Sequence, residues 1–222
     1  KTIISNAKNK MQNAYAFQTK ARDYKSEKIA LIYEQYEKEL ILNNAIDFDD
    51  MLLLTVKLLE NNDEVREIYF SRFSHILVDE FQDTNPSQYS LIKSIYTNNL
   101  LENELEGRSL CVVGDVDQSI YSWRGADFKI ILNFQNDFRN TTLIKLEQNY
   151  RSVETILEAA NYVILNNSQR IDKNLYSNMG KGEKIEHYEA INESNEANYI
   201  ASKIESLKTD NKSWEDFAVL YR

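Results

Sequence analysis

The sequence predicts an α/β fold in which parallel sheets are flanked by helices. Two short apolar runs, at residues 74–78 and 110–114, have the continuous, β-branched character of buried parallel strands. Further strands are predicted at residues 142–146, 184–190 and 217–221. Segments with helical spacing lie between these strands, and such an alternation is typical of a parallel sheet covered by helices.

Helices are predicted on both sides of the first strand. Apolar residues recur at helical spacing through residues 23–43, with charged residues between them, which predicts one long amphipathic helix. Asp47 is a favourable N-cap for the next helix, and Asp49 and Asp50 suit its first turn. This second helix is apolar on most sides, so we expect it to be buried. Further helices are predicted at residues 86–96, 128–138, 152–166 and 194–207.

Composition limits the classes of protein and of site. The net charge of −9 argues against coating nucleic acid by bulk attraction, so any such binding must be local. Cys111 is the only cysteine, which excludes an internal disulfide and argues against a cysteine zinc site. No apolar run approaches the roughly 20 residues of a membrane span, and no leader opens the chain. We therefore expect a cytoplasmic protein that does not bind membranes.

Two adjacent carboxylates, Asp79 and Glu80, follow the first predicted strand. Open α/β sheets place their chemistry just beyond the carboxyl ends of the strands. Magnesium prefers one or two carboxylates together with phosphate oxygens, so Asp79 suits the metal and Glu80 suits the activation of a water molecule. The alternative is a solvated turn, which is the commoner explanation for an isolated pair of acids.

The second predicted strand also ends in polar residues. If it lies beside the first strand, Asp115, Asp117 and Gln118 emerge near the acidic pair. The neutral amide of Gln118 can hydrogen-bond a phosphate oxygen or a water molecule. Gln118 is therefore a candidate sensor of a terminal phosphate.

Tyr121 and Trp123 lie two residues apart, so in an extended backbone both rings leave the same side of the chain. Arg124 adds a cation beside them. Aromatic faces next to an arginine suit unpaired bases, which stack at about 1–3 kcal/mol per base. The alternative is that both rings fill the core.

Arg151 is predicted to stand at the start of a helix, where backbone N–H groups already favour an anion. A guanidinium in this place can bind a phosphate, and across a cleft it can act as an arginine finger, worth roughly 10³–10⁵ in rate. The alternative is an ordinary surface ion pair.

Taken together, these loops resemble known motifs. The stretches VDEFQDTN, GDVDQSIYSWRGAD and LEQNYRS resemble motifs II, III and IV of superfamily 1 DNA helicases of the UvrD, PcrA and Rep family. DFDDMLLL at residues 47–54 and FAVLYR at the end resemble further segments of that family. The resemblance implies an ATP-driven helicase of replication and repair. Such an enzyme moves 3′ to 5′ along single-stranded DNA and separates the duplex ahead.

The resemblance also implies roles for individual residues. Asp79 and Glu80 would lie at the Mg²⁺ ion, with Asp79 serving the metal and Glu80 activating the hydrolytic water. Gln118 would contact the γ-phosphate of ATP. Tyr150 would stack on adenine, and Arg151 would be a finger that reaches ATP from a second RecA-like domain.

The DNA-facing residues and the domains follow in the same way. Tyr121, Trp123 and Arg124 would engage the DNA strand, which is single-stranded or part of a partial duplex. Residues 1–44 would belong to the helical subdomain 1B, residues 45–140 to RecA-like domain 1A of the P-loop NTPase type, and residues 141–222 to RecA-like domain 2A.

One element of that family is missing. The glycines nowhere produce the phosphate-binding pattern G-x-x-x-x-G-K-[ST]. We therefore expect a segment of a longer protein, with partial domains and without ATPase or helicase activity by itself. An exposed sheet edge also makes self-association an expectation.

Three alternatives remain open on the sequence. One is a helicase-nuclease subunit of the RecB or AddA type, which shares these motifs. Another is a DNA-binding module without catalysis, against which Glu80, Gln118 and Arg151 count. The last is a metal nuclease built on four aspartates, which explains neither Gln118 nor Arg151. Those aspartates are Asp79, Asp83, Asp115 and Asp117.

Overall fold

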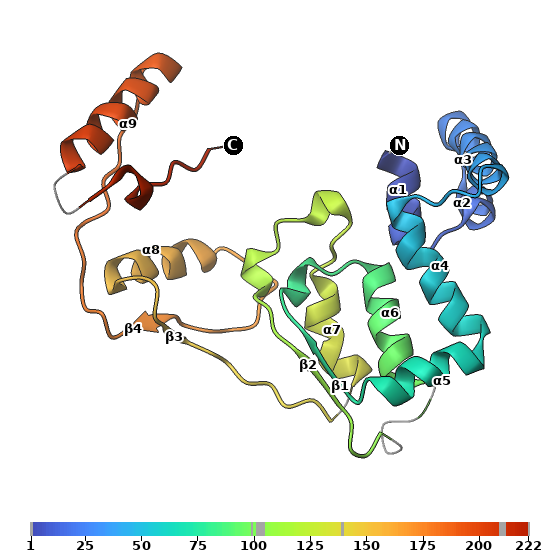
Figure 1. The fold of residues 1–222 in the computed structure, drawn as a ribbon. Helices are drawn as coiled ribbons and strands as arrows, with labels where there is room; N and C mark the ends of the chain where they lie inside the picture. Colours follow the sequence, from blue (N-terminus) through green and yellow to red (C-terminus); the bar gives the residue numbers. More distant parts are fainter. Residues whose placement is uncertain (1, 99, 101–104, 139, 209–211, 222) are drawn as a thin grey trace. The chain divides into compact units, whose positions relative to one another are not determined.

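The computed structural model describes residues 2–98, 100, 105–138, 140–208 and 212–221. Helices and parallel strand pairs make it an α/β protein, as predicted (Figure 1). The chain forms two compact units. The first contains Lys1–Glu147 and Tyr162–Asn174, and the second contains Gln148–Asn161 and Leu175–Arg222. Within the described ranges, no helix is long and apolar enough to cross a membrane.

Helices make up the start of the first unit. They are α1 (Thr2–Asn9), α2 (Ala14–Lys20), α3 (Tyr24–Leu42), α4 (Phe48–Asn61) and α5 (Asp63–Arg72). The predicted N-cap of α4 is confirmed, because the Asp47 side chain accepts a hydrogen bond from the backbone N–H of Asp50. Asp23 caps α3 in the same way. Helix α5 was not predicted.

The expectation that α4 is buried on most sides is wrong. Its buried apolar residues are Leu53, Val56 and Leu59, which recur every three residues and therefore form one face. Met51 and Leu58 remain exposed. In the part of the chain that the structure describes, the neighbours of α4 are α1, α5 and α6, and they cover one side of it.

The sheet of the first unit consists of two parallel strands, β1 (His75–Val78) and β2 (Ser109–Val112), with Val78 opposite Val112. Helices α6 (Pro86–Thr97) and α7 (Lys129–Asp137) follow these strands in sequence. Their apolar side chains pack with those of the strands around a cluster of three phenylalanines. These are Phe81, Phe134 and Phe138.

The other face of this sheet is open. Leu77 is 77% exposed, and Cys111 is exposed as well. Both strands alternate between exposed and half-buried residues, so the expectation of fully buried strands is wrong. A parallel sheet is buried on both faces only where helices cover both. Among the described residues, helices cover only one.

The second unit has less regular structure. Its parallel strands are β3 (Gln148–Asn149) and β4 (Tyr176–Ser177), and its helices are α8 (Glu154–Ile164), through which the division between the units passes, and α9 (Glu193–Leu207). The strands predicted at residues 142–146, 184–190 and 217–221 are wrong, because all three segments are irregular. A strand needs a hydrogen-bonded neighbour, and no described strand pairs with these segments.

Candidate functional site

The acidic pair lies in a tight turn at the carboxyl end of β1. Asp79 and Glu80 are both exposed, whereas the next residue, Phe81, is fully buried and anchors the turn in the core. Glu80 has a φ of 49°, in the left-handed region. For a residue with a Cβ this conformation costs roughly 1–2 kcal/mol, and such strain concentrates at functional sites. The strain argues against an ordinary solvated turn, whereas exposure is compatible with both interpretations.

Gln82 connects this turn to the loop after β2. Its side chain lies in the 3-10 turn Phe81–Asp83 and is 1% exposed. Its Nε2 donates to Glu80 Oε2 at 2.8 Å, and its Oε1 accepts from the backbone N–H of Asp115 at 3.0 Å. The Gln82 carbonyl also accepts from the Ser119 hydroxyl at 3.1 Å. The prediction that the two loops lie together is therefore confirmed.

Gly114 makes this close approach possible. A Cβ at this position would lie 2.6 Å from Gln82 Oε1 and 3.1 Å from the Gln82 backbone nitrogen. Ile131 Cδ1 would lie at 3.1 Å on another side. Since these atoms are packed in the core, any side chain here would displace Gln82 or Ile131.

The loop after β2 holds its own polar residues tightly. The Asp115 carboxylate accepts from the backbone N–H of Asp117 at 3.0 Å and from Gln118 Nε2 at 2.7 Å, and it forms an ion pair with Lys173. Burial raises the pKa of Asp115, but the hydrogen bonds from Lys173 and Gln118 outweigh burial and leave the pKa below its usual value. The side chain of Gln118 is exposed, and its amide is held by the hydrogen bond to Asp115.

The carboxylates of the first turn fit a magnesium ion. Asp79 and Glu80 line a hollow of about 420 Å³ together with Asp83. One oxygen of Asp83, Oδ1, is buried without a hydrogen-bond partner among the described residues. None of these three acids forms an ion pair there either. Magnesium takes one or two carboxylates and completes its shell with water and phosphate, so Asp79 and Glu80 are ligands of a suitable kind. Within the described ranges no group of three His, Cys, Asp or Glu side chains is placed to hold a metal ion.

An exposed aromatic cluster follows in the same loop, formed by Tyr121, Trp123 and Arg124. The two ring centroids are 6.1 Å apart, and the Arg124 guanidinium lies 5.2 Å from the Tyr121 ring and 4.6 Å from the Trp123 ring. Ser122–Arg124 is a 3-10 turn, so the expected extended backbone is wrong. The core-filling alternative is also wrong, because Tyr121 is 37% and Trp123 65% exposed.

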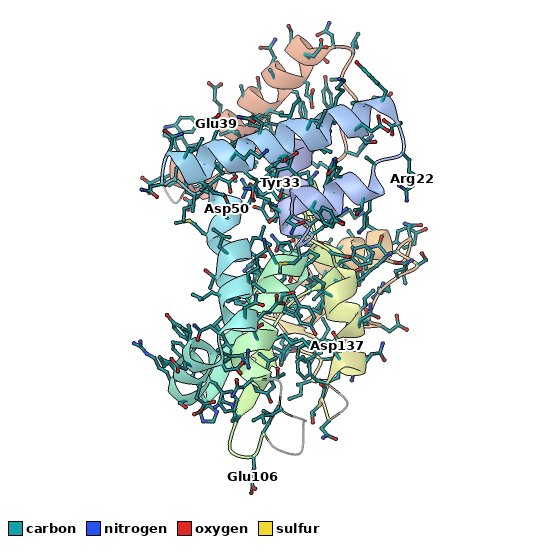
Figure 2. The ribbon with its side chains drawn as sticks, turned by 90° about the vertical axis from the view of Figure 1, so that its right-hand side faces the viewer. Arg22, Tyr33, Glu39, Asp50, Glu106 and Asp137 are labelled. Atoms are coloured by element: carbon teal, nitrogen blue, oxygen red, sulfur yellow. The ribbon has the colours of Figure 1, made fainter. Side chains whose placement is uncertain are left out.

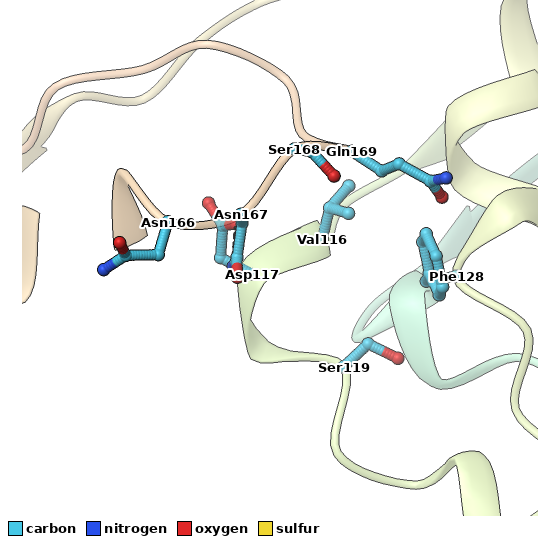
Figure 3. Close-up of a pocket in the computed structure, with 8 residues that line it drawn as sticks. All are labelled: Val116, Asp117, Ser119, Phe128, Asn166, Asn167, Ser168 and Gln169. Carbon is cyan, nitrogen blue, oxygen red and sulfur yellow. Dashed lines mark hydrogen bonds between the residues drawn. The ribbon is translucent and has the colours of Figure 1, made fainter. Parts of the chain in front are cut away.

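A second hollow, of about 500 Å³, lies beside the first turn of this loop (Figure 3). Val116, Asp117, Ser119 and Phe128 line one side of it, and residues 166–169 line the other. Asn167 Nδ2 donates to Asp117 Oδ1 at 2.9 Å. Sequence reasoning missed the contacts of Asn167 and Lys173, since each joins polar residues at least 50 positions apart and no periodicity reports such pairs.

Tyr150 and Arg151 belong to the second unit, whereas Asp79 and Glu80 belong to the first. Both residues are exposed. The expectation that Arg151 stands at a helix start is wrong, because α8 begins at Glu154. The Asn149 side chain instead accepts hydrogen bonds from the backbone N–H groups of Arg151 and Ser152, at 2.9 and 2.8 Å. These bonds stabilise a turn that ends the short strand β3 before the helix begins.

Sequence reasoning also missed a buried cation, Lys8. Its side chain is 0% exposed, and its Nζ lies 2.8 Å from Asp47, 2.7 Å from Asp50 and 2.7 Å from Glu37. Tyr36 donates to the same Asp47 oxygen at 2.8 Å. Burial lowers the pKa of Lys8, but the hydrogen bonds to the three carboxylates outweigh it and raise the pKa above its usual value.

This Lys8 cluster joins α1, α3 and α4, where Tyr33 and Asp50 lie close together (Figure 2). Asn9 extends it, donating to Asp49 at 3.1 Å and accepting from Asn85 at 2.9 Å. Asp47 and Asp49 were predicted only as helix-starting residues. A lysine in a short polar helix gave no signal that it would be buried.

Comparison with known proteins places these residues among helicases. The family model of the UvrD/REP helicase N-terminal domain matches residues 1–139, and that of the UvrD-like helicase C-terminal domain matches residues 144–222. The chain is 46% identical over 219 residues to the ATP-dependent DNA helicase PcrA of Staphylococcus aureus and 44% identical to that of Staphylococcus epidermidis. Each match covers 99% of this chain but 29% of the relative.

Proposed function

We propose, because this chain belongs to the UvrD/REP helicase family, that it carries part of the ATP site and part of the DNA site of a PcrA-type helicase. In this proposal the full-length protein hydrolyses ATP with magnesium, moves 3′ to 5′ along single-stranded DNA and separates strands. Its cellular work would be DNA replication and repair in the cytoplasm.

One observation carries the proposal. The acidic turn and the aromatic cluster are parts of one hydrogen-bonded assembly, joined by Gln82 to Asp115 and Ser119. A backbone hydrogen bond from Asp127 N to Thr84 O, at 3.1 Å, ties the far end of the loop to the same turn. Groups suited to phosphate chemistry and groups suited to bases therefore share one rigid support. A binding module without catalysis would not need the first of these groups.

On the nucleotide side, Asp79 would hold magnesium and Glu80 would orient and deprotonate the attacking water. Magnesium, when bound with ATP, neutralises charge on the phosphate oxygens. Gln118 would exchange its hydrogen bond with Asp115 for one with the γ-phosphate. Tyr150 would stack on adenine, and Arg151 would supply positive charge to the transition state from the second unit.

On the DNA side, Tyr121 and Trp123 would stack on unpaired bases while Arg124 contacts the strand. The exposure of both rings and the nearby guanidinium support this assignment. The chain is acidic overall, with a net charge of −9, so recognition would rest on this local cluster rather than on bulk attraction.

The domain assignment is also a proposal. Residues 1–44 would form part of subdomain 1B, residues 45–140 part of RecA-like domain 1A, and residues 141–222 part of RecA-like domain 2A. The order of helices and parallel strands supports it, as do the two family models, which meet between residues 139 and 144.

A tryptophan pair tests the DNA side in the full-length protein. Trp123→Ala should weaken single-stranded DNA binding by about 1–3 kcal/mol, because one stacking surface is lost. Trp214→Ala removes another exposed indole, one that lies under Lys208, and should leave binding unchanged. Fluorescence anisotropy of a labelled oligonucleotide measures both. Equal losses in the two variants, or no DNA-stimulated ATP hydrolysis by the unaltered protein, would contradict the proposal.

The 222-residue chain alone should be inactive, because it lacks the glycine–lysine phosphate cradle of ATPases. Phosphate release assays with ATP, magnesium and single-stranded DNA should give the same rate with the chain as with buffer alone. Hydrolysis by this chain that Glu80→Gln abolishes would show that the cradle is dispensable.

A further inference from the structure

We propose that Gln82 is a positioning residue that orients Glu80 for catalysis and couples it to the DNA-facing loop. The inference rests on the proposed function, and it concerns a residue that lies behind the acidic pair rather than in contact with ATP. Gln82 is 1% exposed, so neither nucleotide nor DNA reaches it directly.

The hydrogen bonds of Gln82 fix its amide in one orientation. Nε2 faces the Glu80 carboxylate, which can only accept, and Oε1 faces the N–H of Asp115, which can only donate. A flipped amide would set oxygen against carboxylate and N–H against N–H. Nε2 also donates to Asp83 Oδ2 at 3.4 Å, so Gln82 has two acceptors on its own turn and one donor on the other loop.

Glu80 depends on this contact for its direction. Its side chain is exposed, and among the described residues Gln82 is the hydrogen-bond donor to its carboxylate. The strained left-handed backbone of Glu80 sets the direction of its Cα–Cβ bond, and the hydrogen bond from Gln82 restrains its carboxylate. A general base must lie within hydrogen-bond reach of its water, so loss of this restraint lowers the turnover rate.

The same amide transmits the position of the other loop. The peptide of Asp115 that bonds Gln82 begins the segment that carries Gln118 and continues to Tyr121 and Trp123. Gly114 allows that peptide to approach, because a Cβ there would lie 2.6 Å from Gln82 Oε1. A shift of the loop upon DNA binding must therefore move the Gln82 amide, and with it the Glu80 carboxylate.

The test uses the full-length protein and separates kcat from KM. Gln82→Met keeps the volume and removes all three side-chain hydrogen bonds, those with Glu80 and Asp115 and a longer one to Asp83 Oδ2 at 3.4 Å. A hydrogen bond to a charged group is worth about a tenfold to hundredfold change in a rate constant. We expect kcat of DNA-stimulated ATP hydrolysis to fall by that factor, while KM for ATP and affinity for single-stranded DNA stay within about twofold. Gln135→Met, on the exposed side of α7, is the matched control and should change nothing.

Two further variants keep the inference falsifiable if Gln82→Met unfolds. Gln82→Glu keeps an oxygen that accepts from the Asp115 N–H but removes the Nε2 donor to Glu80. We expect kcat to fall while KM for ATP stays within about twofold, a split that a general loss of structure would not produce. Gly114→Ala displaces the Gln82 amide without altering it and should lower kcat in the same manner.

The outcomes decide between two failures. If the unaltered protein hydrolyses ATP and Gln82→Met matches it, the positioning role is wrong while the proposed function stands. An unchanged kcat in Gln82→Glu, or a parallel loss of ATP binding, DNA binding and kcat, also overturns the role. If the unaltered protein shows no DNA-stimulated hydrolysis, the proposed function fails first.

Discussion

Two groups of carboxylates in this chain differ in their surroundings. Asp47, Asp50 and Glu37 surround Lys8, whose side chain has no exposed surface. Each carboxylate has an oxygen within 2.8 Å of the Lys8 ammonium. Asp79 and Glu80 lie in the open at the end of a strand, and in the described ranges neither is paired with a cation. The first group holds helices together, whereas the second is exposed and accessible to a metal ion or water.

The difference teaches how to distinguish structural from chemical acids. Adjacent acids occur in both places in the sequence, as Asp49-Asp50 and as Asp79-Glu80. What separates them is a partner: the buried Lys8 pairs with all three carboxylates of the first group and offsets part of their charge, since burying a charge without a partner is costly. Acids left exposed and unpaired in a strained turn are the better candidates for a site.

The largest expected effect contrasts the same change in both groups. If Glu80 is the general base proposed above, Glu80→Gln in the full-length protein should lower ATP turnover by about 10²–10⁴ while local stability is kept. Asp50→Asn should instead loosen α1 and α4 and leave the chemical step intact. Single-turnover hydrolysis and hydrogen exchange of the α4 peptides measure the two effects. Loss of turnover without loss of protection in Asp50→Asn would erase the distinction.

The next effect concerns the cation. Lys8→Met leaves three carboxylates without their partner and should reduce the local free energy of opening by about 3–5 kcal/mol, read from hydrogen exchange in α1, α3 and α4. Lys38→Met is the matched control, because Lys38 pairs with Glu34 on the exposed surface of α3, where such pairs contribute about 0.3–0.5 kcal/mol. Similar losses in both variants would mean that burial adds nothing to the pair.

A smaller effect comes from a single hydroxyl. Tyr36→Phe removes the hydrogen bond to Asp47 but keeps the ring, which lies 5.1 Å from the Lys8 ammonium. A bond to a charged group contributes about 1.5–3 kcal/mol, and the low end applies because Asp47 retains Lys8. Exchange in the first turn of α4 should report it. Unchanged protection there would show that water replaces the hydroxyl.

The smallest effect is a dependence on pH. Burial raises the pKa of Asp47, but bonds from Lys8, Asp50 N–H and Tyr36 outweigh it and lower the pKa from 3.8. A lowered carboxyl pKa means that Asp47 adds stability above pH 3.8 and that this stability is lost as pH falls through the lower folded value. Protection of α4 should therefore decrease below this pH. In Lys8→Met the trend should reverse, since protonation then relieves three unpaired carboxylates.

Local signals made the helices and the loop chemistry predictable. Asp23, Asp47 and Pro86 begin helices as expected, because capping and proline geometry depend on neighbouring residues alone. The proximity of the two loops after β1 and β2 followed from the pairing of parallel strands.

Features set by distant partners were not predictable. Residues 142–146 have strand composition but lack a neighbour among the described strands, so they stay irregular. The burial of Lys8 depends on carboxylates 29 to 42 positions away in sequence, and the contact between Lys173 and Asp115 spans 58 positions. The link through Gln82 was hidden for the same reason, since its role appears only once both loops are in place.

The left-handed backbone at Glu80 has an evolutionary consequence. Glycine would adopt this conformation without strain, although it would remove the nearest acceptor of the buried Gln82 amide. Glutamate at this position therefore carries a cost in backbone strain that glycine would avoid. In lineages where a duplicated copy no longer needs the proposed catalysis, we expect position 80 to change to glycine or asparagine earlier than the buried residues beside it. Such a substitution would identify copies that have lost the activity.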